Sequence, residues 1–138
     1  MTGNGNYLVL GGEFPTVNGT KQQGLVRFAV SSIAPNKVLP LSSSGLLPHA
    51  TALGGGRVKV SWTTTWDYDN QNLTYKLLRD GVTLVSTQSK NSSFWQLSGM
   101  TYTDSGLAVG SSHSYKVQTV DPFGNIRYAG SGNTVTVT

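Results

Sequence analysis

Short runs in which apolar and polar residues alternate, separated by turn-forming residues, recur along the chain from residue 48 onward. In the run RVKVSWT, Val58, Val60 and Trp62 fall on one face and polar residues fall on the other. The run 115–120 alternates in the same way, and a period of two residues is that of a half-buried β-strand. No apolar pattern with the helical period of 3.6 competes over a useful length. The pattern therefore predicts an all-β fold.

A hairpin is predicted around Asp80-Gly81. The run LTYKLLR precedes this dipeptide and VTLVSTQ follows it, and Asp-Gly between two alternating runs favours a two-residue hairpin turn. SSFWQLSG and MTYTD predict a further extended region, and in the final NTVTVT both Val135 and Val137 fall on one face. Short strands with frequent turn signals are typical of a β-sandwich.

Tyr115 stands at the start of its predicted strand, with Gly110 five residues before it. In many Greek-key sandwiches a tyrosine at this position turns back and donates a hydrogen bond to the backbone a few residues upstream. We expect Tyr115 to do so, with Gly110 giving the corner its backbone freedom and Leu107 filling the core beneath it.

These features resemble a fibronectin type III domain. The resemblance covers residues 48–138. Three further features carry it: Trp62 on the second strand, YKLLRDG on the third and DPFGN at the end of the sixth. It is strongest to the domains found in secreted proteins of actinobacteria and other bacteria. It implies a seven-stranded, immunoglobulin-like Greek-key sandwich with structural roles for Trp62, Tyr75, Leu107, Gly110 and Tyr115.

Residues 1–40 have a different pattern, in which YLVLGG and GLVRFAV predict two strands around a glycine-rich turn. The turn is similar to a delta-60 type β-propeller repeat at Gly11, Gly12, Phe14, Val17, Asn18 and Gly19. A two-stranded unit cannot bury its own apolar face. We therefore expect residues 1–40 either to be the blade remnant of a larger propeller or to pack on the sandwich, on neighbouring domains or on other copies of the chain. Residues 41–47 are then the linker to a sandwich at 48–138.

Charge and composition exclude several classes of function. Ten Lys and Arg against six Asp and Glu give a net charge of +4, but the basic residues are scattered and do not form the patch that nucleic-acid binding needs. Cysteine is absent, which excludes disulfides and thiolate chemistry. No apolar run is long enough for a membrane span, and the first residues lack the basic and apolar regions of a signal peptide.

Two polar groupings invite a chemical interpretation. Asp67, Asp69, Asn70 and Asn72 carry oxygen donors suited to a hard cation, but the EF-hand spacing fails, because a glycine and a glutamate are missing at the required positions. A polar loop without a metal is the expected structure here.

His113 lies among Ser111, Ser112 and Ser114 and is near Asp104 and Asp121 in sequence. A serine nucleophile needs an oriented histidine and an oxyanion hole, and no G-x-S-x-G pattern is present. The sequence therefore predicts neither an enzyme nor a cofactor.

Aromatic residues are the best functional lead. Trp66 and Tyr68 fall in a predicted loop and Trp95 in a predicted extended segment, and exposed aromatic rings stack on the apolar faces of sugars. The other interpretation is that Trp66 and Trp95 only cover the open ends of a thin sandwich.

Three functions follow from these observations. The first is a non-catalytic extracellular spacer or interaction module of a larger secreted or cell-surface protein. The second is a carbohydrate-binding accessory module that uses Trp66, Tyr68 and Trp95 to bind polysaccharide or a cell-wall polymer. The third is a subunit of an assembled appendage or phage-like fibre, in which residues 1–40 add strands to a neighbour.

Overall fold

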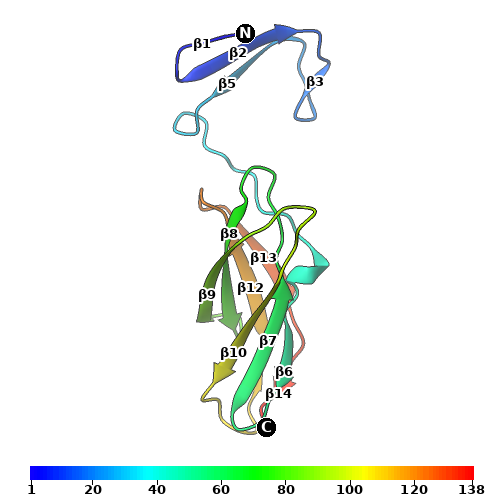
Figure 1. Ribbon diagram of the computed structural model, residues 1–138, viewed down its shortest axis with the longest axis vertical. Coiled ribbons are helices and arrows are strands. Elements are labelled where there is room, and N and C mark those ends of the chain that lie inside the picture. The colour runs from blue at the N-terminus through cyan, green and yellow to red at the C-terminus, as the bar shows by residue number, and fades with distance from the viewer. The chain divides into compact units, whose positions relative to one another are not determined.

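A computed structural model describes all residues from Met1 to Thr138 and divides the chain into two compact units, Met1–Lys37 and Val38–Thr138 (Figure 1). The fold is all-β, and its one helical element is the short 3-10 turn η1, Ser44–Leu46. The predicted linker, 41–47, lies inside the second unit, because Leu46 is buried in the core of that unit.

The first unit consists of two small antiparallel sheets. One sheet has the order β1-β2-β5, and a two-stranded sheet pairs β3 with β4. The bounds of these strands are β1 Thr2–Gly3, β2 Tyr7–Gly12, β3 Thr16–Val17, β4 Thr20–Lys21 and β5 Gly24–Ala29. None of its residues is fully buried. The unit therefore has the predicted pair of strands but no hydrophobic core of its own.

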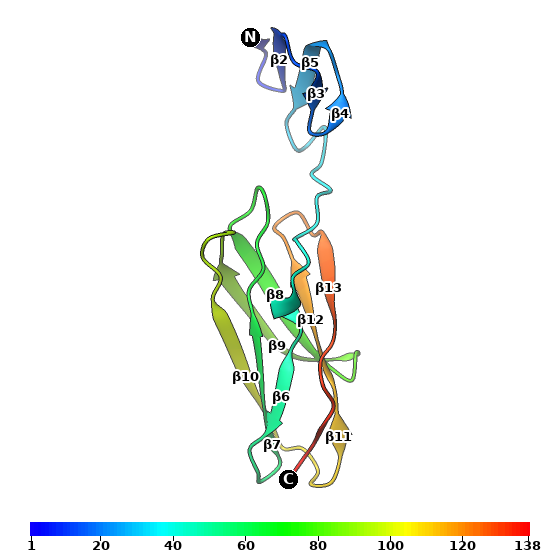
Figure 2. The same cartoon turned by 90° about the vertical axis from the view of Figure 1, so that its right-hand side faces the viewer.

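The second unit contains two main antiparallel sheets and a small third one (Figure 2). The order is β10-β7-β6 in one main sheet and β13-β12-β8-β9 in the other, while β11 pairs with β14. The bounds are β6 His49–Ala52, β7 Arg57–Thr63, β8 Asn72–Arg79, β9 Thr83–Asn91, β10 Gly99–Ser105, β11 Ser112–His113, β12 Tyr115–Val120, β13 Ile126–Ser131 and β14 Val135–Thr136.

The core of the second unit is built from both main sheets. The predicted alternation is confirmed in β7 and β12, where every second residue is buried. Trp62, on β7, and Tyr75, on β8, are among the buried side chains of a single cluster. The apolar faces of the two sheets therefore meet in one core.

The hairpin predicted at Asp80-Gly81 is confirmed, since β8 and β9 pair antiparallel on either side of this dipeptide. Both residues have positive φ, 53° for Asp80 and 75° for Gly81, and the N–H of Val82 donates to the carbonyl of Arg79. Such a turn matches the twist of the two strands, and Asp-Gly tolerates its left-handed backbone best.

The prediction for the Tyr115 hydroxyl was wrong. It donates to Oδ2 of Asp104 over 2.9 Å, a side chain eleven residues upstream and not the backbone. Arg79 donates to the same oxygen over 2.9 Å, and burial raises the pKa of Tyr115. A buried carboxylate is costly unless it is paired, and Tyr115 and Arg79 both satisfy Asp104. Gly110 has the expected positive φ of 86°, and Leu107 packs against the core.

Candidate functional site

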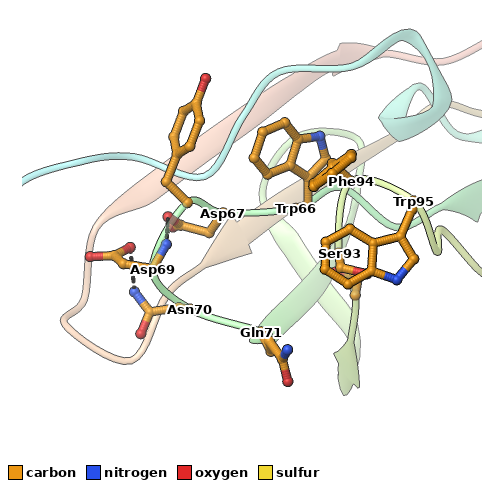
Figure 3. Close-up of a pocket in the computed structure, with 10 residues that line it drawn as sticks. Trp66, Asp67, Asp69, Asn70, Gln71, Ser93, Phe94 and Trp95 are labelled. Carbon is orange, nitrogen blue, oxygen red and sulfur yellow. Dashed lines mark hydrogen bonds between the residues drawn. The ribbon is translucent and has the colours of Figure 1, made fainter. Parts of the chain in front are cut away.

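A pocket of about 630 Å³ lies where two connections of the second unit meet, one between β7 and β8 and the other between β9 and β10 (Figure 3). The residues that line it are Trp66, Asp67, Tyr68, Asp69, Asn70, Gln71, Ser92, Ser93, Phe94 and Trp95.

Four aromatic rings make up the apolar part of the pocket. The centroid of the Trp66 ring lies 4.8 Å from that of Tyr68 and 5.7 Å from that of Phe94, and the Phe94 centroid lies 4.5 Å from that of Trp95. Trp66 is half-buried, while Tyr68, Phe94 and Trp95 are all exposed. The three residues predicted to bind sugar thus lie in one pocket, and exposed apolar clusters of this kind mark interaction surfaces.

Phe94 was not among the predicted site residues. The run SSFWQLSG, residues 92–99, was predicted to be extended, and neighbouring residues of a strand point to opposite faces. In the structure Ser93 and Gln96 form two backbone hydrogen bonds with each other, so Phe94 and Trp95 are the central residues of a tight turn. Both rings therefore reach the pocket.

Buried hydrogen bonds hold the first pocket loop at its start. The backbone N–H of Thr65 donates to the Tyr75 hydroxyl over 3.1 Å, and this hydroxyl donates to the carbonyl of Thr65 over 3.0 Å. The Thr65 hydroxyl donates to the carbonyl of Leu41 over 2.7 Å. Tyr75 therefore has a structural role, because it fixes the backbone that carries Trp66.

A second set of bonds ties the two pocket loops together. The backbone N–H of Thr64 donates to the carbonyl of Ser98, and the N–H of Ser98 donates to the Thr64 hydroxyl, each over 2.9 Å. Ser92 donates to the carbonyl of Thr65. These contacts anchor the aromatic turn of one loop against the Trp66 loop.

Asp67 is unusual among the pocket residues because it is a carboxylate that is only 7% exposed and no lysine or arginine of the pocket neutralises its charge. Its Oδ1 accepts a hydrogen bond from the backbone N–H of Asp69, but its Oδ2 is buried without a hydrogen-bond partner. Burial, together with the nearby Asp69, raises the pKa of Asp67 to about 6. No lysine or arginine lines the pocket.

The oxygen donors considered for a cation do not converge. Asn70 donates to Asp69 over 2.9 Å, and Asn72 donates to Asn91 on the neighbouring strand over 2.7 Å. No three histidine, aspartate or glutamate side chains lie together in a way that could hold a metal ion.

His113 lies between Ser111 and Asp80, an acid that the sequence analysis had not associated with it. Its Nδ1 lies 2.7 Å from Oδ2 of Asp80, and its Nε2 lies 2.9 Å from the Ser111 hydroxyl. That hydroxyl also donates to the carbonyl of Ala108 over 2.6 Å, a bond that competes with donation to the imidazole because a hydroxyl has one hydrogen. A nucleophilic serine must donate to the histidine, and its acid must be buried, whereas the Asp80 side chain is 46% exposed.

This group of residues instead joins the β8–β9 turn to β11. The hydrogen bond with His113 holds the pKa of Asp80 below its usual range, and the backbone N–H of Ser114, 3.0 Å from Oδ1, acts in the same direction. These hydrogen bonds therefore have a structural role, because they hold the β8–β9 turn against the segment that carries His113.

Comparison with known proteins gives one partial similarity. No protein-family model matches the chain. Over 74 residues the chain is 35% identical to "Chitinase 63" of Streptomyces plicatus, which amounts to 54% of this chain and 10% of that chitinase. The similarity concerns a small part of the chitinase, and it is compatible with a non-catalytic module. The structure contains no helix with the length and hydrophobicity that crossing a bilayer requires.

Proposed function

We propose that this chain is a non-catalytic polysaccharide-binding module of a larger secreted or cell-surface protein. The second unit is a fibronectin type III-like sandwich in this proposal. The strand orders β10-β7-β6 and β13-β12-β8-β9 support it, as does a core shared between the two sheets. A sandwich of this kind carries its binding residues on the loops at one end, which is where the pocket lies.

The convergence of four aromatic rings in one pocket carries the proposal. Tyr68 is 73% exposed and Trp95 69% exposed, although burying such rings releases more free energy than burying smaller apolar side chains. Sugar rings offer apolar C–H faces of matching size, and the polar side chains of the rim can bond their hydroxyls. Because the similar protein is called a chitinase, chitin is the first polymer to test.

The spacer function remains compatible with this proposal, since a rigid sandwich also separates its neighbours. The pocket makes binding the more specific hypothesis. The appendage hypothesis rests on residues 1–40, which have no core of their own and need a packing partner.

The test is a pull-down on insoluble chitin, cellulose and bacterial cell walls. We expect the parent chain to be depleted from solution, and the Trp66→Ala, Trp95→Ala double variant to bind at least about thirtyfold more weakly, because two central rings together contribute about 2 kcal/mol or more. Phe123→Ala is the matched control, since Phe123 is 50% exposed and lies outside the pocket.

Two outcomes would contradict the proposal. One is that the folded double variant binds as well as the parent chain. The other is that none of these polymers depletes the parent chain. Circular dichroism of each variant establishes that it is folded before its binding is compared.

A further inference from the structure

The acidic side chains of the second unit fall into two groups. Asp104 pairs with Arg79 and Asp80 with His113, while Asp121 accepts hydrogen bonds from the backbone N–H groups of its own turn. The second group consists of Asp67 and Asp69, which both line the pocket and form no ion pair. The pocket therefore carries unbalanced negative charge in a chain whose net charge is +4.

The two carboxylates offer different contacts to a ligand. Asp69 is exposed and can meet a ligand group directly, whereas Asp67 is buried and its Oδ2 is unpartnered. A buried carboxylate without a counter-charge is costly, and a bound cation supplies the missing charge. Figure 3 shows both carboxylates on one side of the pocket and the rings of Phe94 and Trp95 on the other.

The rings are not arranged as one flat platform. The planes of neighbouring rings meet at 72° for Trp66 and Tyr68, 57° for Trp66 and Phe94 and 87° for Phe94 and Trp95. Rings set at such angles form walls, and the π face of an aromatic wall attracts a cation within about 6 Å. The structure's two cation–π contacts, Arg27 over Tyr7 and Lys116 over Tyr128, lie on other rings, so the faces in the pocket have no cation of the protein itself.

We propose that the pocket selects sugars that carry an ammonium group, as in a deacetylated amino-sugar polymer, over neutral sugars. The ammonium group lies beside Asp69 and Asp67 against Trp66 and Tyr68, and the sugar chain extends over Phe94 and Trp95. This assignment rests on the proposed polysaccharide-binding function and names the ligand class of the same site. The net positive charge of the chain repels a cationic ligand at long range. A preference for charged sugars must therefore come from the pocket and not from the overall charge of the protein.

The test compares short oligosaccharides with one backbone and three substituents. Calorimetry at about pH 7, above the raised pKa of Asp67, measures binding of the full chain to the β-1,4-linked glucosamine tetramer, its N-acetylated form and its N-trimethylated form. The trimethylated form keeps its charge at every pH. We expect the trimethylated tetramer to bind about tenfold more tightly than the acetylated one, since a cation–π contact and an ion pair together supply this factor, and the glucosamine tetramer to show the same preference in proportion to the protonated fraction of its amines.

Variants locate the preference. Asp67→Asn with Asp69→Asn should abolish the preference for charged tetramers while the acetylated tetramer still binds, whereas Glu13→Gln, which removes a carboxylate outside the pocket, should leave it unchanged. NMR titration of the Asp67 carboxyl carbon gives an independent readout, because the pKa of Asp67 should fall below about 6 on binding the glucosamine tetramer.

The outcomes separate this inference from the proposed function. Equal binding of charged and acetylated tetramers would overturn the inference and leave polysaccharide binding intact. Binding of no tetramer, and of no polymer, would overturn both. A preference that survives in the double aspartate variant would also overturn the inference, as would tetramethylammonium binding as tightly as the glucosamine tetramer, because the sugar would then contribute nothing.

Discussion

Asp67 shows how one residue of the pocket can lower the stability of the folded protein. It is buried beside another carboxylate, and its pKa is raised from 3.8 to about 6. Between these two values the unfolded chain loses the Asp67 proton while the folded chain keeps it. Stability therefore falls as the pH rises through this range, and the deficit persists at neutral pH.

We expect Asp67→Asn to stabilise the protein at neutral pH. The variant removes a charge that folding must bury, so its free energy of unfolding at pH 8 should exceed that of the parent chain by about 2 kcal/mol, with little difference below about pH 4. Urea denaturation of both chains at a series of pH values measures this. An equal difference at all pH values would show that ionisation of Asp67 is not its cause.

Asp80 supplies a control of opposite sign. Its pKa is lowered, so its ionised form stabilises the folded state above the usual aspartate pKa, and this contribution is lost as the pH falls through the lowered value. Asp80→Asn should therefore destabilise the protein at neutral pH, by well under about 1 kcal/mol because the side chain is 46% exposed.

Two glycines at strand ends, Gly132 and Gly99, differ in how closely other backbone approaches them. A Cβ at Gly132, just after β13, would lie 1.8 Å from the carbonyl oxygen of Pro48, so the two segments approach more closely than any side chain permits. At Gly99, the first residue of β10, an added Cβ would meet nothing within 4 Å, and φ is not positive. The two glycines look alike in sequence and differ only in what the fold brings to them.

We expect Gly132→Ala to lower the free energy of unfolding by about 2 kcal/mol or more, because the backbone of Pro48 has to move. Gly99→Ala should be neutral or slightly stabilising, because alanine restricts the unfolded chain more than glycine does. Thermal unfolding of both variants checks the pair. A Gly132→Ala protein as stable as the parent chain would contradict the close approach.

Alternation and turn residues were enough to predict many of these elements. The strands around Val60 and Val117 and the turn at Asp80-Gly81 follow from patterns that lie within a few neighbouring residues. The pattern failed where the structure depends on distant pairing. The tight turn at Phe94 has no glycine, proline, asparagine or aspartate at its two central positions to signal it, and the partner of Tyr115 is fixed by how β10 faces β12.

The site was predictable in part for the same reason. The exposed aromatic residues Trp66, Tyr68 and Trp95 could be chosen by residue type and predicted location. The buried state of Asp67 could not, because it depends on how the two loops fold over one another. Likewise, Asp80 is far in sequence from His113, and only the pairing of strands brings the two together.

At the scale of the molecule the two units differ in how they are stabilised. Every buried hydrophobic residue belongs to the second unit, whereas Leu25 and Phe28 of the first unit remain exposed. Hydrophobic burial is the main source of stability, so the second unit has what it needs to fold alone and the first does not.

We expect a chain of residues 38–138 to fold and to bind as the full chain does. Its melting temperature should lie within a few degrees of that of the full chain, because none of the buried core is removed. Residues 1–37 alone should give the NMR spectrum of an unfolded peptide. A large loss of stability or binding on truncation would show that the first unit supports the second.

The backbone bond from Leu41 to the carbonyl of Trp66 places the incoming chain directly beside the pocket, and Arg127 holds the neighbouring carbonyl of Pro40. When a force acts on the chain at residue 38 while a polymer holds the pocket, these few hydrogen bonds bear the force one after another. The ladder of β12 on β8 has many bonds that share a load along the strands. If the pocket binds a polymer as proposed, tension therefore reaches the pocket before it reaches the core, and binding should weaken under a force that leaves both main sheets intact.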